Sequence, residues 1–209
     1  MSIDEQIIAI LEERKKSLEL QKSKEEQIEE IIKQIKEDNK VTTDKLDLEM
    51  EQHHFFNKSF SMYMPKYFEE MSEEHVNIKY PNANRPKILY TDSNSVVDIC
   101  LNLLEEETWT KEQVVEFRNV MATAFLSTSP SSKIFDMGQF ALEEEIPVAY
   151  YAFDSYAIGG SMYNLIFITL LGDKILIVSM NCPQKEMEQY ELLFYGIMHT
   201  TTIEKELSP

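Results

Sequence analysis

The pattern of apolar and polar positions predicts buried strands in the C-terminal half of the chain. Two apolar runs, 162–171 and 174–180, are joined by a two-residue link that begins with Gly172. A glycine-first link of this length is typical of a tight β-hairpin. Because the runs barely alternate with polar residues, other layers are expected to cover both faces of these strands. We therefore expect central strands, with Phe167 and Val178 inside the core.

Further strands and two amphipathic helices are predicted around this centre. One helix begins at Thr110, where Gln113 completes a capping box, and the last helix ends near His199. A shorter helix is expected at 66–71. Strands are expected at 55–64, 87–91, 96–103 and 133–142. These elements predict an α+β fold, in which two amphipathic helices flank a mainly antiparallel sheet.

The first 39 residues predict helix in one of two arrangements. They contain neither Gly nor Pro, and their apolar residues gather toward both ends around a polar middle. One long helix is favoured over a hairpin that breaks near Lys22-Ser23, because nothing there requires a turn. Residues 38–52 are polar and are expected to form a linker. The chain is thus divided into a helical segment with its linker over 1–52 and a folded domain over 53–209.

Isoleucines near the end of this helical segment are expected to be buried. Isolated helices are marginal in water without tertiary contacts. The segment also carries too many apolar residues for a solvated helix. We expect its apolar residues to pack on the domain, a second copy or a partner: Ile28, Ile31, Ile32 and Ile35. The opposite end, with Ile7, Ile10 and Leu11, is expected to be recognised by another chain as a helix in a groove.

The net charge of the chain limits the classes of binding partner that are expected. The 209 residues carry a formal net charge of -17, which repels nucleic acid phosphate and anionic lipid. We therefore expect neither nucleic acid nor a membrane as a partner, and a basic protein surface would complement the chain. The N-terminus is acidic where a signal peptide needs bases, so a cytoplasmic location is expected. Homo-oligomerisation is left open.

The residues whose side chains could take part in catalysis or metal binding do not form a catalytic or metal-binding motif. Cys100 and Cys182 lie in or beside predicted strands, where free cysteines usually act as small buried apolar groups. Adjacent histidines at 53–54 point to opposite faces of a strand and cannot easily share a metal ion. The glutamate clusters at 105–107 and 143–145 lack calcium-loop spacing. No catalytic residue, cofactor or metal site is expected.

A proline- and asparagine-rich loop, YPNANRP at 80–86, and several tyrosines are the best candidates for a binding surface. Tyrosine offers apolar area with a polar tip and is enriched at interfaces. Arg85 could meet a partner's carboxylate, or it could pair with one of the chain's own acids. The residues expected to bind a partner are Ile7, Ile10, Leu11, Arg85, Tyr151, Tyr156 and Tyr163.

Five short stretches carry a family resemblance: MPKYFEEM at 64–71, IKYPNANRPKI at 78–88, FDSY at 153–156, MYN at 162–164 and NCP at 181–183. Together they resemble a group of uncharacterised proteins from Gram-positive gut bacteria (gut Firmicutes) that is similar to the PsbP-like (Mog/PsbP) α/β/α sandwich. The resemblance spans roughly residues 60–199. It implies a fold whose members are mostly binding proteins, among them photosystem subunits, a Ran-binding protein and chaperone-like adaptors. No catalytic motif carries over.

Two functional hypotheses follow. The first is a non-catalytic protein-interaction module, such as an adaptor, a chaperone-like protein or a toxin-neutralising protein. It would bind its partner through the N-terminal helix and the sheet surface. The second is a small-ligand-binding protein or enzyme with a pocket under the 80–86 loop. A deep pocket with convergent polar groups would favour the second hypothesis, and an exposed patch would favour the first.

Overall fold

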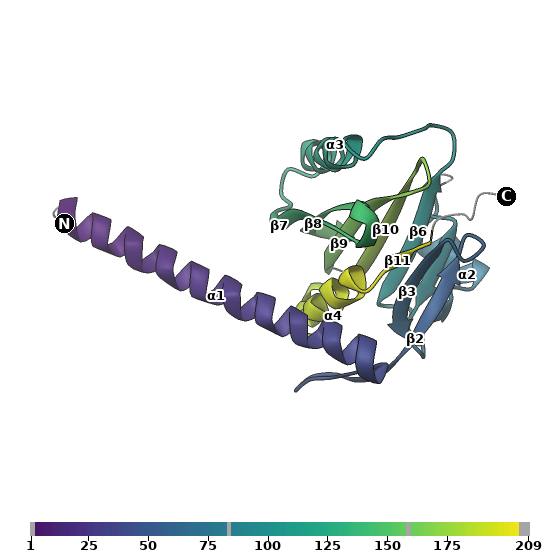
Figure 1. Ribbon diagram of the computed structural model, residues 1–209, viewed down its shortest axis with the longest axis horizontal. Helices are drawn as coiled ribbons and strands as arrows, with labels where there is room; N and C mark the ends of the chain where they lie inside the picture. Colours follow the sequence, from purple (N-terminus) through teal and green to yellow (C-terminus); the bar gives the residue numbers. More distant parts are fainter. Residues whose placement is uncertain (1–2, 83–84, 158–159, 205–209) are drawn as a thin grey trace.

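A computed structural model describes residues 3–82, 85–157 and 160–204. It begins with one long helix, α1 (Ile3–Asp38), which runs beside a layered α+β body and extends well beyond it (Figure 1). The other α-helices and strands are, in chain order, β1 (Lys40–Thr42), β2 (Asp47–Phe55), β3 (Phe60–Pro65), β4 (Glu69–Glu70), α2 (Glu73–Lys79), β5 (Ile88–Thr91), β6 (Asp98–Leu104), α3 (Gln113–Thr128), β7 (Ile134–Ala141), β8 (Pro147–Ala157), β9 (Gly160–Leu171), β10 (Lys174–Pro183), α4 (Met187–His199) and β11 (Thr202–Ile203). Two short 3-10 helices, η1 (Glu143–Glu145) and η2 (Gln184–Glu186), precede β8 and α4.

Two antiparallel sheets form the body. The larger has seven strands in the order β4-β5-β6-β10-β9-β8-β7, and the smaller has four in the order β1-β2-β3-β11. The central hairpin pairs Phe167 with Val178 across β9 and β10, and Gly172 takes the positive φ of 63° that its turn requires. Both paired side chains are buried, as predicted. The mainly antiparallel sheet with flanking helices is therefore confirmed.

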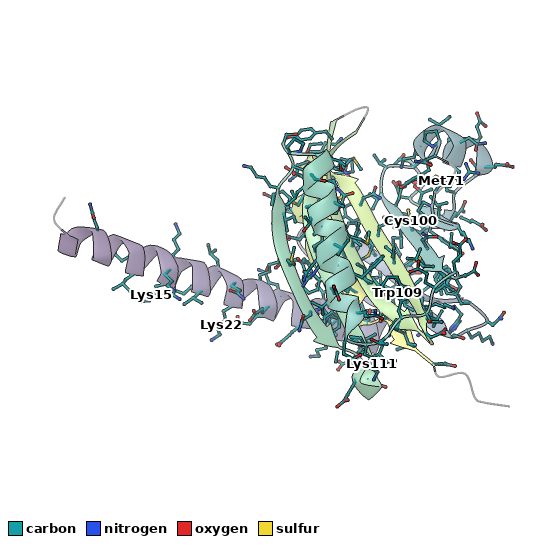
Figure 2. The ribbon with its side chains drawn as sticks, turned by 90° about the horizontal axis from the view of Figure 1, so that it is seen from above. Lys15, Lys22, Met71, Cys100, Trp109 and Lys111 are labelled. Carbon is teal, nitrogen blue, oxygen red and sulfur yellow. The ribbon has the colours of Figure 1, made fainter. Side chains whose placement is uncertain are left out.

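Helices cover both faces of the larger sheet. On one face lie α4 and the last turns of α1, and buried side chains of the small sheet, such as Phe60 and Met62, belong to the same core. On the other face, α3 covers β8 and β9 around Ile168, and α2 covers β5 and β6 around Cys100. Figure 2 shows α3 lying across the sheet. Because both faces are covered, the central strands need apolar side chains at nearly every position.

The N-terminal segment is a single helix, so the helical-hairpin alternative is wrong. Ile31 and Ile35 are buried and Ile28 is half-buried, which confirms that this end of the helix packs on the rest of the chain. It packs on α4 at Gly196. A Cβ atom placed on Gly196 would lie 2.4 Å from the Cγ2 of Ile31. The absence of a side chain at Gly196 therefore lets the two helices approach closely.

The predicted linker over residues 38–52 is wrong in its local structure. Residues 40–42 and 47–55 form strands, with Met50 opposite Pro65 in β3. In β2 only Met50 and Phe55 are buried, so the alternation that signals a strand is weak in the sequence.

Two other local predictions are also wrong. The expected strand over 55–64 is a hairpin, because Phe56, Asn57 and Lys58 take positive φ and reverse the chain. The expected helix at 66–71 is a turn followed by β4. A helix starts just after it, where the Ser72 side chain accepts a hydrogen bond from the His75 N–H (3.4 Å).

Candidate interaction surface

The N-terminal part of α1, residues 3–23, is called the projecting half; it points away from the body (Figure 1), and its last turn, with Leu20 and Gln21, still borders the body. Its described leucines are open to solvent: Leu11 is 59%, Leu18 61% and Leu20 63% exposed. The side chains of Ile7 and Ile10, which were also expected to bind a partner, lie outside the described part of the chain. The geometry therefore places Leu11, of these three residues, on an exposed helical surface.

Charged side chains keep the projecting half polar around its leucines. Lys15 pairs with Glu19 and Lys22 with Glu26, each at 4.0 Å and with i,i+4 spacing. Figure 2 shows Lys15 and Lys22 along this part of the helix. Such exposed pairs stabilise a helix by about 0.3–0.5 kcal/mol each. They support helical structure but do not cover the apolar side chains.

A groove of about 740 Å³ separates α1 from the strand β7 and is called the α1–β7 groove. Its lining comes from four elements: Leu20, Gln21, Lys24, Glu25, Ile28, Glu29 and Ile32 on α1, Phe135 and Asp136 on β7, Tyr150 on β8, and Tyr195 and His199 on α4. The lining thus combines aliphatic, aromatic and acidic side chains. No sequence motif marked this groove, because its residues come from segments that lie far apart in the chain.

Hydrogen bonds and ring contacts fix the inner wall of the groove. Tyr195 donates its hydroxyl hydrogen to Oδ2 of Asp136 (2.5 Å), and burial raises the pKa of Tyr195 well above its ordinary value. Lys24 pairs with Glu191 at 2.8 Å, and its Nζ lies 4.4 Å from the centre of the Tyr195 ring. Burial lowers the pKa of His199, which favours the neutral imidazole. The inner wall is therefore preorganised, and its one lysine is already paired.

The outer wall of the groove is the edge of the seven-stranded sheet. β7 stands at the end of the strand order, paired with β8. Phe135 is 44% and Met137 41% exposed on this strand. The Met137 N–H donates to Oδ1 of the neighbouring Asp136 (2.8 Å), so this amide faces away from β8. An exposed edge of this kind offers backbone groups for pairing with another chain.

A buried arginine, which the sequence analysis did not select, holds this edge in place. Arg118 lies in the apolar stripe of α3 and is buried, and burial lowers its pKa. Its Nη1 donates to the carbonyl oxygens of Gly138 on β7 and Tyr150 on β8, each at 3.0 Å. The signal that could have identified it is a lone arginine on an otherwise apolar helix face.

Two of the tyrosines predicted to bind a partner are instead part of the core. Tyr151 is 2% and Tyr163 0% exposed, whereas Tyr156 is 66% exposed. Tyr151 stacks on Phe153 beneath α3, and Tyr163 lies parallel to Phe194 of α4. Helices cover the strands at these two positions, so both rings are buried, whereas Tyr156 lies near the end of β8 and is exposed. The expectation for Tyr151 and Tyr163 is corrected, and Tyr156 keeps an accessible position.

The described residues of the 80–86 loop, 80–82 and 85–86, do not bring reactive groups together. Arg85 donates to the amide oxygen of Asn77 (2.6 Å) and lines a hollow of about 520 Å³. Behind the start of the loop, buried Asp98 accepts hydrogen bonds at 2.6–2.8 Å from Lys79, Tyr80 and Thr91. Both carboxylate oxygens of Asp98 are thereby used, and the cluster fixes α2 to the sheet.

Both cysteines are buried and unreactive in character. Burial raises the pKa of the Cys100 and Cys182 thiols to about 12, so the nucleophilic thiolate is scarce at neutral pH. Within residues 3–82, 85–157 and 160–204, no group of three or more His, Cys, Asp or Glu residues could hold a metal ion. None of the helices in those ranges has the length and hydrophobicity to cross a membrane.

A second cavity, of about 830 Å³, lies near the β9–β10 turn and the start of α3. Trp109 lines it and packs edge-on against Phe117, with ring centroids 5.0 Å apart. Among the described residues the Trp109 indole N–H has no hydrogen-bond partner. The cavity also carries acidic and basic side chains, among them Glu105 and Lys174. It is a candidate ligand site that sequence analysis did not find.

Known structures resemble the fold. No protein-family model matches the chain, and no curated protein matches it. The solution structure of the cyanobacterial PsbP protein CyanoP from Synechocystis sp. PCC 6803 matches with a TM-score of 0.55 and 6% identity, over 78% of this chain and 98% of that one. LpqN, involved in cell envelope biogenesis of Mycobacterium tuberculosis, matches with a TM-score of 0.51 and 13% identity, over 76% and 92%. Likeness at these identities concerns the fold, and the fold is PsbP-like.

Proposed function

We propose that the chain is a non-catalytic protein-interaction module, an adaptor, chaperone-like or toxin-neutralising protein, that binds a protein partner through α1 and the adjoining sheet surface. The observation that carries the proposal is the projecting half of α1, where Leu11 and Leu18 are exposed on a helix held clear of the body (Figure 1). An amphipathic helix of this kind is a common element of helix-in-groove recognition.

Charge supports a particular class of partner. With a net charge of -17, the chain attracts a protein with a basic surface and repels nucleic acids and anionic membranes. A cytoplasmic location and a source among Gram-positive gut bacteria belong to the same proposal. Self-association through the projecting half remains an alternative, in which the partner is a second copy.

A pair of matched variants tests the proposal. Leu11→Ser with Leu18→Ser removes the apolar surface, and Glu12→Ser with Glu19→Ser makes the same number of changes at exposed polar positions of the same helix. Losing the binding free energy that burial of each leucine contributes, about 1 kcal/mol, would weaken binding roughly thirtyfold in total. Both variants should unfold at the same denaturant concentration as the unmodified chain, because neither pair of side chains contacts the core.

The measurement is affinity capture from the native organism, followed by mass spectrometry and titration of the captured protein. The glutamate variant should retain the partner and the leucine variant should lose it. Equal capture by both variants would refute the role of the projecting half. Sedimentation of the purified chain separates a foreign partner from self-association.

Small-ligand binding is a second candidate. The cavity beside Trp109, at about 830 Å³, lies within the usual range for ligand pockets. Trp109 is the chain's single tryptophan, so its fluorescence would report a ligand there directly. A ligand or enzyme pocket under the 80–86 loop remains the other form of this hypothesis. A metabolite screen that shifts Trp109 emission or unfolding temperature would favour this candidate.

A further inference from the structure

We propose, building on the interaction role above, that the α1–β7 groove receives an extended, alternately apolar and basic segment of a partner protein, which pairs with the outer edge of β7 as an additional strand. The proposal joins three features of the same place: a sheet edge, an apolar groove beside it and a surplus of carboxylates along it. Each feature favours one property of the segment.

The edge of β7 favours an extended backbone. Among the described residues, no strand pairs with the outer side of β7, and the Met137 N–H bonds only to its neighbour's carboxylate. In an antiparallel strand, residues two apart direct their backbone groups to the same side. The amides of Met137, Gln139 and Ala141 therefore face outward together. From Asp136 to Ala141 the strand pairs regularly with β8, so this part of the edge is straight enough to accept a partner strand.

The groove favours apolar side chains on one face of that segment. Phe135 lies parallel to Tyr163, a core residue on the α4 face of the sheet, so the groove opens on this face. Leu20 and Phe135, both exposed, form its rim on opposite sides. A strand added to β7 would direct every second side chain into the space between them. Aliphatic residues at alternate positions would then bury their surface against α1.

The charges along the groove favour a basic segment. Glu25, Glu29 and Asp136 contribute three carboxylates, and Lys24, the only lysine of the lining, already pairs with Glu191. A lysine or arginine on the added strand would meet this acidic surplus. A second copy of the chain, with a net charge of -17, would bring like charges to the same groove. The occupant is therefore assigned to a partner protein.

The test uses the full chain and a synthetic nonapeptide that alternates valine and lysine. A peptide that alternates valine and glutamate is the matched control for charge. Binding is measured by titration, and amide hydrogen exchange locates the contact. The expected result is saturable binding of the lysine peptide, slowed exchange at Met137, Gln139 and Ala141, and at least tenfold weaker binding of the glutamate peptide. No saturable binding, protection at other amides or equal binding of both peptides would overturn the proposal.

Variants of β7 and of the acidic side chains test the contributions of the strand edge and of the negative charge separately. Gln139→Pro removes an outward-facing N–H, and proline is tolerated on edge strands, so affinity should fall about two- to tenfold while Gln139→Ala binds normally. Glu25→Gln and Glu29→Gln should each weaken the lysine peptide by about two- to fivefold. If Gln139→Pro fails to fold, the exchange map and the glutamate variants decide the question. Protection of the β7 amides in a dimer, without peptide, would assign the edge to a second copy and overturn the proposal.

This experiment is independent of the test of the projecting half. Leu11 and Leu18 lie outside the groove lining, so their serine variants should bind the nonapeptide normally. If the nonapeptide does not bind but the leucine variant still loses the partner, the groove proposal is refuted and the interaction module stands. Failure of both would refute both.

Discussion

Replacing Gly196 by alanine tests the contact that anchors α1 on the body. The new Cβ would lie 2.4 Å from Cγ2 and 3.3 Å from Cβ of Ile31, and 3.3 Å from Cδ1 of Ile35. A separation of 2.4 Å is far below van der Waals contact. The Cγ2 of isoleucine is attached to the branched Cβ, whose rotamer is stiff in a helix, so it cannot simply swing away. We expect α1 and α4 to be forced apart at this point.

The expected magnitude is the balance of two opposing effects. Overpacking of a close-packed core costs about 1–3 kcal/mol. Alanine in place of glycine in a helix interior restores about 0.5–1 kcal/mol. The net loss should therefore reach about 2.5 kcal/mol at most and about zero at least. Ile31→Ala alone should cost about 2–5 kcal/mol, because Ile31 is buried.

The combination of both changes gives the sharper measurement. With Ile31 shortened, the methyl group at position 196 no longer clashes and fills part of the space. The double variant should therefore be more stable than the sum of the single changes by at least about 1 kcal/mol. Urea denaturation followed by far-ultraviolet circular dichroism gives the four free energies. Additivity within about 0.5 kcal/mol, or a gain in stability from Gly196→Ala alone, would show that the helices do not meet as described.

Three further predictions concern the core and its titratable groups. Phe167→Ala should cost about 3–5 kcal/mol in urea denaturation, because the ring is fully buried in the central hairpin, and a loss below about 1 kcal/mol would contradict that position. Burial lowers the pKa of His199, so the stability linked to its neutral form is complete above about pH 6.5 and is lost as the pH falls through the lowered folded value. The free energy of unfolding should fall less between about pH 7.5 and about pH 5 for His199→Gln than for the unmodified chain, and an equal fall in both would contradict this. With thiol pKa values of about 12, Cys100 and Cys182 should resist a thiol reagent in the folded chain and react in urea, whereas fast reaction without urea would place a thiol at the surface.

The sequence predicts the strands that are buried on both faces, and it fails where most side chains of an element are solvated. The 162–180 hairpin could be predicted because its two apolar runs and the glycine turn between them both indicate a pair of antiparallel strands. β2 could not, because nine residues bury two side chains and present polar groups elsewhere. The start of α2 could have been recognised from the N-cap residue Ser72 followed by Glu73 and Glu74 in the first turn. Its one buried residue is Val76, so the helix has no apolar stripe in the sequence.

The candidate interaction surface was only partly predictable, for a geometric reason. Tyrosines are common both at interfaces and in cores, and residue type alone does not separate the two. Extending the covered-strand argument from β9 to β8 would have placed Tyr151 in the core. The α1–β7 groove joins Leu20 to Phe135, and no local pattern predicts that a helix passes beside an edge strand more than a hundred residues later.

The continuity of α1 has a mechanical consequence. The projecting half and the anchored turns around Ile35 are one uninterrupted helix, so the costly nucleation step is already made at the anchored end. At 1.5 Å per residue, the helix from Ile3 to Ser23 spans about 30 Å. It therefore acts as a stiff spacer: a molecule attached at its tip is held about one domain diameter from the sheet, and torque applied there is delivered to α4. Order along the spacer should decay outward, with amide exchange becoming faster toward Ile3.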